Sequence, residues 1–144
     1  MSIEMHVLFK GTLPAKAAVT DKMQELGFPF SIEDPHESLE TQRGYMPMRF
    51  RGAETGVQFD VFEDGDLLQD FADANPDQKF ERSANFRWSS DETEMLCAMC
   101  ACAALATLVD GLVLDEFSDG PLSQQQAIEL ARETLASVAP ADRA

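Results

Sequence analysis

The sequence predicts an α+β fold, with a mainly antiparallel sheet of about five to six strands and three main helices packed mostly on one face. Strictly alternating apolar residues indicate strands, and apolar residues at helical spacing indicate helices. The order β-α-β-β-β-α-β-α-β-α mixes hairpins with helix-linked strands, unlike a doubly wound sheet. The 144 residues, 44% of them hydrophobic, suffice for one core. We therefore expect a single globular domain over residues 1–144, with residues 139–144 as a frayed tail.

Alternation of apolar and polar residues marks the strands in the first half of the chain. In the first strand, only Leu8 breaks the alternation. The third and fourth strands flank the Gly-rich segment GAETG, residues 52–56, which predicts a β-hairpin with this segment as its connection. The predicted strands cover residues 3–9, 28–32, 46–50 and 57–61.

Two helices are expected in this half. Thr12 and Pro14 are typical of a helix start, and Gly27 of the position just after a helix end, so the first helix is predicted to reach Leu26. A short second helix is predicted from Asp66 to Ala74. It stops at Asn75-Pro76 because the residue before a proline disfavours the helical conformation.

The second half is predicted to alternate strands and helices. Residues 80–88 form a strand with a bend near residues 83–85, and residues 112–114 form a brief one. Ser89 and Glu92 have the spacing of a capping box and open the longest helix, which runs to about Val109. Ser123 and Gln126 repeat that spacing at the start of a last amphipathic helix.

The net charge of −15 restricts the function classes. Nucleic-acid binding and binding to anionic membranes both need a basic surface, so we expect neither partner. The N-terminus lacks the charged and apolar regions of a secretory signal. The longest apolar run, residues 95–106, is shorter than the roughly 20 residues that span a membrane. We expect a cytoplasmic protein without a membrane segment.

Three cysteines lie close together at Cys97, Cys100 and Cys102. A Cys-x-x-Cys pair can bind metal or cycle as a dithiol, but this pair lies about two turns inside the predicted helix, beyond the field of its N-terminus. Cys102 is about 160° around the helix from Cys100, so the three thiols do not converge on one ion. We predict that they pack in the core, with no cofactor and no metal.

The acidic residues are concentrated after residue 51. Residues 1–51 carry seven acids and six bases, whereas residues 52–144 carry nineteen acids and five bases. On the second helix Asp66, Asp70 and Asp73 recur at i, i+4 and i+7 and form one acidic ridge. The residues predicted to bind a partner are Asp60, Glu63, Asp64, Asp66, Asp70, Asp73 and Asp77. The alternative is a solvated acidic face that only keeps the protein soluble.

A calcium-binding EF-hand does not account for these acids. With Gly65 or Gly120 placed at position 6 of the EF-hand loop, phenylalanine occupies position 3, and position 12 lacks its glutamate. We therefore assign no metal ligands among the acids, and whether folding brings carboxylates together around a divalent cation stays open.

Residues 102–132, CAALATLVDGLVLDEFSDGPLSQQQAIELAR, resemble a pattern in small bacterial proteins of uncharacterised or toxin-immunity type. The pattern is a helix ending in Ala-Leu-Ala, a short strand closed by Asp, a Gly-containing turn and a Ser-capped helix. The resemblance implies a compact α+β protein that neutralises a partner by covering its active site, and the acidic ridge suits a basic nuclease. It carries over no functional residue.

The sequence thus predicts a non-enzymatic cytosolic protein-interaction module, of the immunity or inhibitor kind, that binds a basic partner through an acidic surface. The alternative is a small enzyme or thiol-based redox sensor that uses Cys97, Cys100 or a histidine, His6 or His36. No catalytic residue is assigned, because no nucleophile, phosphate-binding or dinucleotide-binding motif is present. The oligomeric state stays open.

Overall fold

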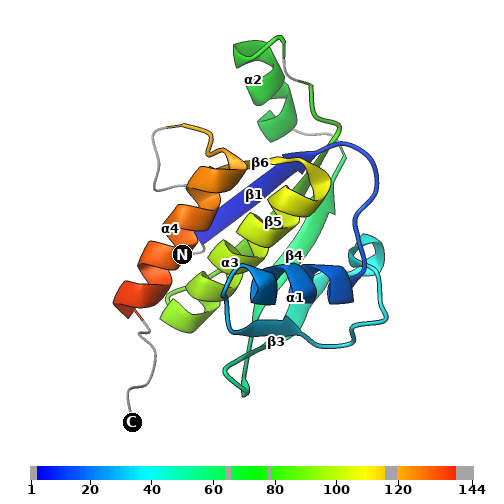
Figure 1. Cartoon of the computed structure of the whole chain (residues 1–144). Coiled ribbons are helices and arrows are strands. Elements are labelled where there is room, and N and C mark those ends of the chain that lie inside the picture. The colour runs from blue at the N-terminus through cyan, green and yellow to red at the C-terminus, as the bar shows by residue number, and fades with distance from the viewer. Residues whose placement is uncertain (1–2, 64–65, 78, 116–119, 139–144) are drawn as a thin grey trace.

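The computed structural model describes residues 3–63, 66–77, 79–115 and 120–138, and it confirms an α+β fold built on one antiparallel sheet (Figure 1). Six strands follow the order β2-β3-β4-β5-β1-β6, and each neighbouring pair is antiparallel. The strands are β1 (Ile3–Phe9), β2 (Phe30–Ile32), β3 (Gly44–Phe50), β4 (Ala53–Phe62), β5 (Arg82–Trp88) and β6 (Leu112–Asp115). The predicted frayed tail, residues 139–144, lies outside the described residues.

Three helices cover one face of this sheet, as predicted, and a fourth lies apart from them (Figure 1). The central α3 packs across the sheet, with α1 on one flank and α4 on the other. The short α2 connects β4 to β5 and projects beyond the end of the sheet. A 3₁₀ turn, η1, occupies part of the segment 37–43, which had no predicted structure. The bounds are α1 (Lys16–Glu25), η1 (Leu39–Thr41), α2 (Asp66–Ala74), α3 (Glu92–Val109) and α4 (Gln124–Val138).

The core centres on α3. All eleven residues from Leu96 to Ala106 are buried, because the sheet covers one side of the helix and α1 and α4 cover its flanks. The small alanines and cysteines of this segment let the helix approach its neighbours closely. By length and composition alone α3 also resembles a membrane-crossing helix, but core helices of globular proteins meet the same criterion, and 61% of α3 is buried within the chain.

The connection between β3 and β4 is shorter than predicted. Phe50 pairs with Ala53, so the turn consists of Arg51 and Gly52 alone, both with positive φ angles of 50° and 86°. Two consecutive positive φ angles are typical of the type I′ hairpin turn. The GAETG segment was wrongly predicted to be this turn: Gly56 lies within β4, against the side chain of Tyr45, where an added Cβ would collide.

Two further local predictions were wrong and one is confirmed. The side chain of Asp91, rather than Ser89, caps α3 and accepts hydrogen bonds from the backbone N–H groups of Thr93 and Glu94, at 2.8 and 3.1 Å. Helix α1 begins at Lys16 rather than near Thr12. The predicted capping box of α4 is confirmed. The backbone N–H of Ser123 donates to Oε1 of Gln126 at 2.9 Å, and the backbone N–H of Gln126 donates to Oγ of Ser123 at 3.1 Å.

Strand β5 is uninterrupted where a bend near residues 83–85 was predicted. It pairs residue by residue with β1 from Arg82 to Trp88. Ala84 and Phe86 therefore face the helices, whereas Ser83 and Asn85 face the opposite side of the sheet.

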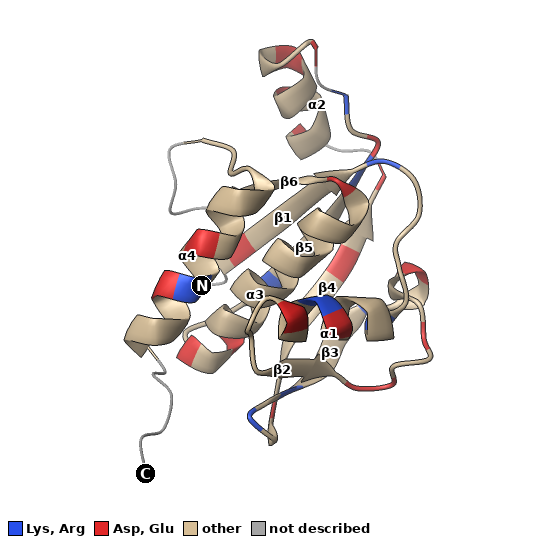
Figure 2. Ribbon diagram, viewed as in Figure 1, with Lys and Arg blue, Asp and Glu red and all other residues tan. Residues whose placement is uncertain are grey.

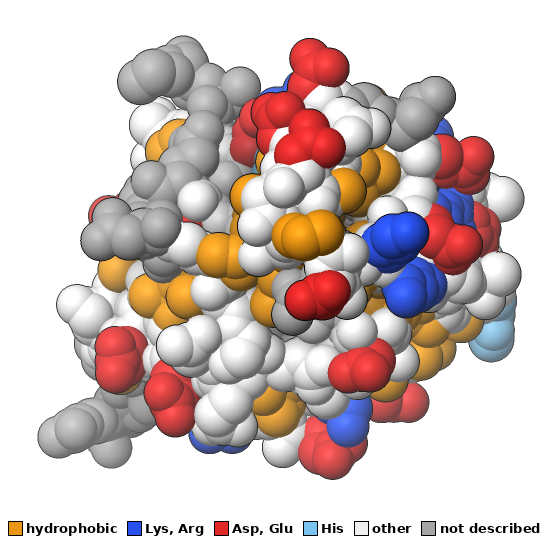
Figure 3. All heavy atoms as spheres, turned by 90° about the horizontal axis from the view of Figure 1, so that it is seen from above, with side chains coloured by type: hydrophobic (Ala, Val, Ile, Leu, Met, Phe, Trp, Pro, Cys, Tyr) orange, Lys and Arg blue, Asp and Glu red, His pale blue; other side chains and the backbone are white. Residues whose placement is uncertain are grey.

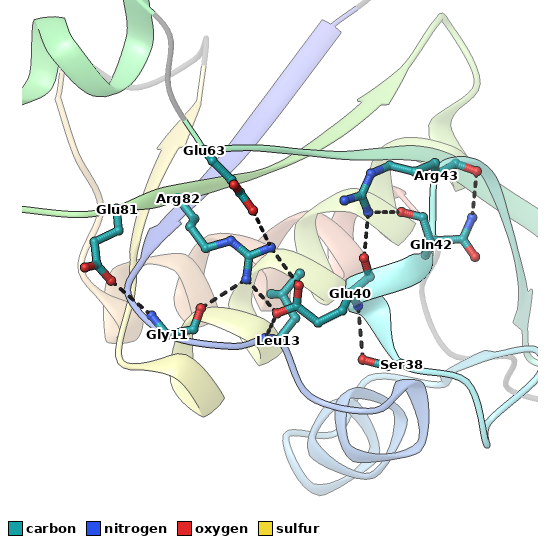
Figure 4. A network of polar contacts seen from close by, with 9 residues as sticks. All are labelled: Gly11, Leu13, Ser38, Glu40, Gln42, Arg43, Glu63, Glu81 and Arg82. Atoms are coloured by element: carbon teal, nitrogen blue, oxygen red, sulfur yellow. Dashed lines mark hydrogen bonds and ion pairs between the residues drawn. The ribbon is translucent and has the colours of Figure 1, made fainter.

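An ion pair joins the loops at one end of the sheet (Figure 4). The guanidinium of Arg82 donates to both carboxylate oxygens of Glu40, at 2.6 and 2.7 Å, and to the carbonyl of Gly11 at 3.0 Å. Glu40 also accepts a hydrogen bond from the backbone N–H of Leu13. The pair fastens η1 and the loop after β1 to the start of β5. The hydrogen bond from Arg82 is the main cause that lowers the pKa of Glu40.

We expect Glu40→Gln to lower the free energy of unfolding by about 1.5–3 kcal/mol at neutral pH, because it removes a charge-assisted hydrogen-bond pair. Since the folded-state pKa of Glu40 is lowered, its stabilisation is present above the ordinary value of 4.5 and is lost as pH falls through the folded value. The difference in the free energy of unfolding between the variant and the wild type should therefore become smaller at acidic pH. Urea unfolding at a series of pH values measures it.

The control is Glu63→Gln. Glu63 faces the same guanidinium at 3.5 Å, but its side chain is 74% exposed, so its loss should cost less than about 0.5 kcal/mol. Equal effects of the two variants would show that Glu40 has no special role.

Candidate functional site

The predicted acidic ridge lies on α2, whose bounds match the predicted helix. Asp66, Asp70 and Asp73 are all exposed. On the opposite side of the helix, Phe71 is buried and its ring packs against that of Phe80, with 5.7 Å between centroids. Figure 2 shows these acidic positions on a helix that stands away from the rest of the chain. Within the described residues, none of the three aspartates forms an ion pair with a lysine or arginine.

The structure does not bring the other predicted partner-binding acids into the same arrangement. Asp60, on β4, lies 3.9 Å from the guanidinium of Arg87, and Glu63 turns toward Arg82. Asp77 is exposed beyond the end of α2 and lines a separate hollow with Lys10 and Lys79. Asp64 lies outside the described residues. Within the described residues, the ridge on α2 is therefore the part of the predicted surface where several acids lie together without an ion pair.

A groove runs between α2 and the sheet face that the other three helices leave uncovered. It has a volume of about 450 Å³ and is lined by residues of β1, α2 and β6 and by the start of the segment before α4. A neighbouring hollow of about 260 Å³ shares Glu4, His6 and Leu67 with it and extends toward β5. Seen from above, this end of the molecule presents acidic side chains next to exposed hydrophobic ones (Figure 3). The lining of the groove includes Glu4, His6, Leu67, Asp70, Phe71, Ala74, Leu114 and Asp115.

A cluster of polar side chains forms the floor where the two hollows meet. Glu4 and His6 of β1, and Ser83 and Asn85 of β5, all occupy strand positions that point away from the helices, and His6 pairs directly with Asn85. Ser83 is 1% exposed and Asn85 4% exposed, so both need internal hydrogen-bond partners. The amide Nδ2 of Asn85 lies 3.1 Å from Oε1 of Glu4 and 3.2 Å from Nδ1 of His6.

These distances define the hydrogen-bond directions. A carboxylate only accepts, so the amide nitrogen of Asn85 donates one hydrogen to Glu4, and its second hydrogen points to His6. In the tautomer that carries its proton on Nε2, Nδ1 of His6 accepts this hydrogen. The hydroxyl of Ser83 lies 3.4 Å from the same Nδ1. Asn85 thereby holds the Glu4 carboxylate at the base of the groove.

The contact between Ser83 and His6 does not make a nucleophile. The Ser83 side chain is sealed from solvent, and the His6 nitrogen that it approaches already accepts from Asn85. A catalytic serine needs a base that takes its proton and an open path to the substrate. The other histidine, His36, lies exposed in a loop. We assign no catalytic role to this cluster.

The cysteines are free thiols buried in α3. Burial raises the pKa of Cys97 to about 12, and it raises the pKa of Cys100 and Cys102 as well. Cys97 donates to the hydroxyl of Thr55 at 3.7 Å. Thiolates are the reactive and metal-binding form, so such thiols are inert at neutral pH. Among the described residues, no group of His, Cys, Asp or Glu side chains is arranged to hold a metal ion.

The sequence predicted the aspartates on α2 but no groove beneath them. Alternation along the first strand puts Glu4 and His6 on one face of the sheet. Ser83 and Asn85 were missed, because a bend was expected there. The alternation of these residues with Ala84 and Phe86 is the signal that would have put them on the same face as His6.

The chain matches no protein-family model, and no curated protein or solved structure shows significant similarity to it. The resemblance of residues 102–132 to toxin-immunity-type proteins accordingly stays a prediction from sequence. Any functional proposal must rest on the geometry of the described residues.

We expect a thiol reagent to label none of the three cysteines rapidly in the native protein at neutral pH, because all are buried and protonated. Addition of urea should expose Cys97, Cys100 and Cys102 together, because all lie on one buried helix. Absorbance of the released reagent, followed over time, measures both rates. Fast labelling of a single cysteine in the native protein would contradict the packing role and favour a redox sensor.

Proposed function

We propose that this chain is a non-enzymatic protein-interaction module, of the immunity or inhibitor kind, that binds a basic protein partner through the acidic surface of α2. The observation that carries the proposal is the placement of Asp66, Asp70 and Asp73. They are exposed on a helix that projects from the end of the sheet, and no basic residue of the described chain neutralises them.

The energetics of α2 support this proposal. Like charges four residues apart destabilise a helix by roughly 0.2–0.5 kcal/mol per pair, and Asp66 offsets only part of this at the N-terminal end. No other described helix or strand packs extensively against α2. A basic partner would remove the repulsion, and complementary charge would speed the encounter between the two proteins.

The remaining features of the chain agree with a binding role in a reducing compartment. Its thiols are unpaired and buried, which suits the cytosol better than an oxidising environment. The polar cluster around His6 lacks an accessible nucleophile. Neither feature favours the alternative of a small enzyme or thiol-based redox sensor.

Charge reversal on α2 tests the proposal. In the first step, the wild-type chain is used to capture binding proteins from a cell extract at low salt, and the basic protein among them is purified. We expect the triple variant D66K/D70K/D73K to associate with this basic protein about tenfold or more slowly than the wild type at low salt, and the difference to be smaller at high salt. Stopped-flow mixing or surface plasmon resonance measures the rates, and thermal unfolding shows that the variant folds.

A matched control separates a local effect from net charge. The triple variant D21K/E129K/E133K makes the same charge change at exposed positions of α1 and α4. It should slow association far less than the α2 variant. If both variants slow binding equally, or if the α2 variant has no effect, α2 is not the binding surface.

A further inference from the structure

The geometry points to a specific occupant for the groove beneath α2: one arginine side chain of the basic partner, paired with the carboxylate of Glu4. This inference rests on the proposed function and names a side chain of the same partner, which would enter the groove that Asp70 of the ridge also lines.

The walls suit a long side chain with an apolar stem. Leu67 and Phe71 of α2 face Leu114 of β6 across a groove of about 450 Å³, within the usual size range of binding pockets. Arginine and lysine bury their methylene stems along such apolar surfaces while their charged ends reach polar groups. Arginine also stacks its planar guanidinium on aromatic rings, which favours it over lysine where Phe71 lines the site.

The charge of the lining selects a cation. Three carboxylates, those of Glu4, Asp70 and Asp115, line the groove, and among the described residues no lysine or arginine lines it. These carboxylates would repel an anionic ligand. A guanidinium would gain charge-assisted hydrogen bonds in partly desolvated surroundings.

Glu4 is positioned to receive this ligand. Asn85, which is 4% exposed, donates to its Oε1 at 3.1 Å and so fixes the carboxylate before any ligand arrives. Within the described residues Glu4 has no basic partner, and its second oxygen accepts no hydrogen bond. A carboxylate held in place loses little freedom on binding, which increases affinity.

A titration with N-acetyl-arginine amide tests the inference without the protein partner. In NMR spectra of the full chain, we expect saturable shifts of the methyl signals of Leu67 and Leu114. The neutral isostere N-acetyl-citrulline amide, which has the same shape, should cause no comparable shifts. Equal shifts with both compounds would show that the groove does not distinguish a cationic ligand from a neutral one of the same shape.

The variant Glu4→Gln removes the charge but keeps an oxygen that can accept from Asn85, so the fold should persist. It should weaken binding of N-acetyl-arginine amide about tenfold, as expected for loss of a charged hydrogen-bond partner. The control Glu133→Gln makes the same change at an exposed position of α4 and should leave binding unchanged. Lack of saturable binding, or an unaltered affinity of the Glu4 variant, would overturn the inference.

The two proposals fail in distinguishable ways. If the arginine probe does not bind but D66K/D70K/D73K still slows association with the captured partner, the groove inference is wrong and the proposed function stands. If the probe binds through Glu4 but the α2 variant leaves association unchanged, the groove holds a cation and the ridge is not the protein-binding surface.

Discussion

The burial of α3 against the sheet is the constraint on which the rest of the structure depends. Every residue from Leu96 to Ala106 is enclosed, with the sheet on one side and α1 and α4 on the flanks. This arrangement requires a helix of small and apolar residues, and it commits one whole face of the sheet to the core. The three cysteines are part of that packing, and their raised pKa values follow from it rather than from any chemistry that they perform.

Since one face of the sheet is committed to α3, the other face is free to carry polar residues. Along β1 and β5, alternate side chains divide between the two faces, so Met5 and Phe86 pack toward the helices while His6 and Asn85 point away. Helix α2, in the connection between β4 and β5, lies next to this polar face. The groove is the space that results, and its lining comes from segments that are far apart in the sequence: residues 4–6, 67–75, 83–85 and 114–115.

The acidic excess has two different consequences in the folded chain. Some carboxylates face arginines and hold the fold together, most clearly Glu40, whose bidentate pair with Arg82 connects η1 to β5. Others, on α2, form no ion pair with a lysine or arginine of the described residues, and they repel each other at a small cost to the helix. A surface that binds a basic partner needs carboxylates without an internal ion pair, because a carboxylate already paired with an arginine gains less from a basic residue of the partner. The ridge and Glu4 meet this condition, whereas Asp60 and Glu63 do not.

The sequence by itself determined the features that depend on neighbouring residues. The α+β class, the bounds of α2 and the capping box at Ser123 were predicted correctly, because periodicity and i, i+3 hydrogen bonding act within a few residues. The tertiary structure alone decided the features set by cross-strand register: the two-residue turn at Arg51, the uninterrupted course of β5, and the meeting of Glu4 with Asn85. Register depends on how whole strands pair and pack, and residues some eighty positions apart become neighbours only when the sheet has formed.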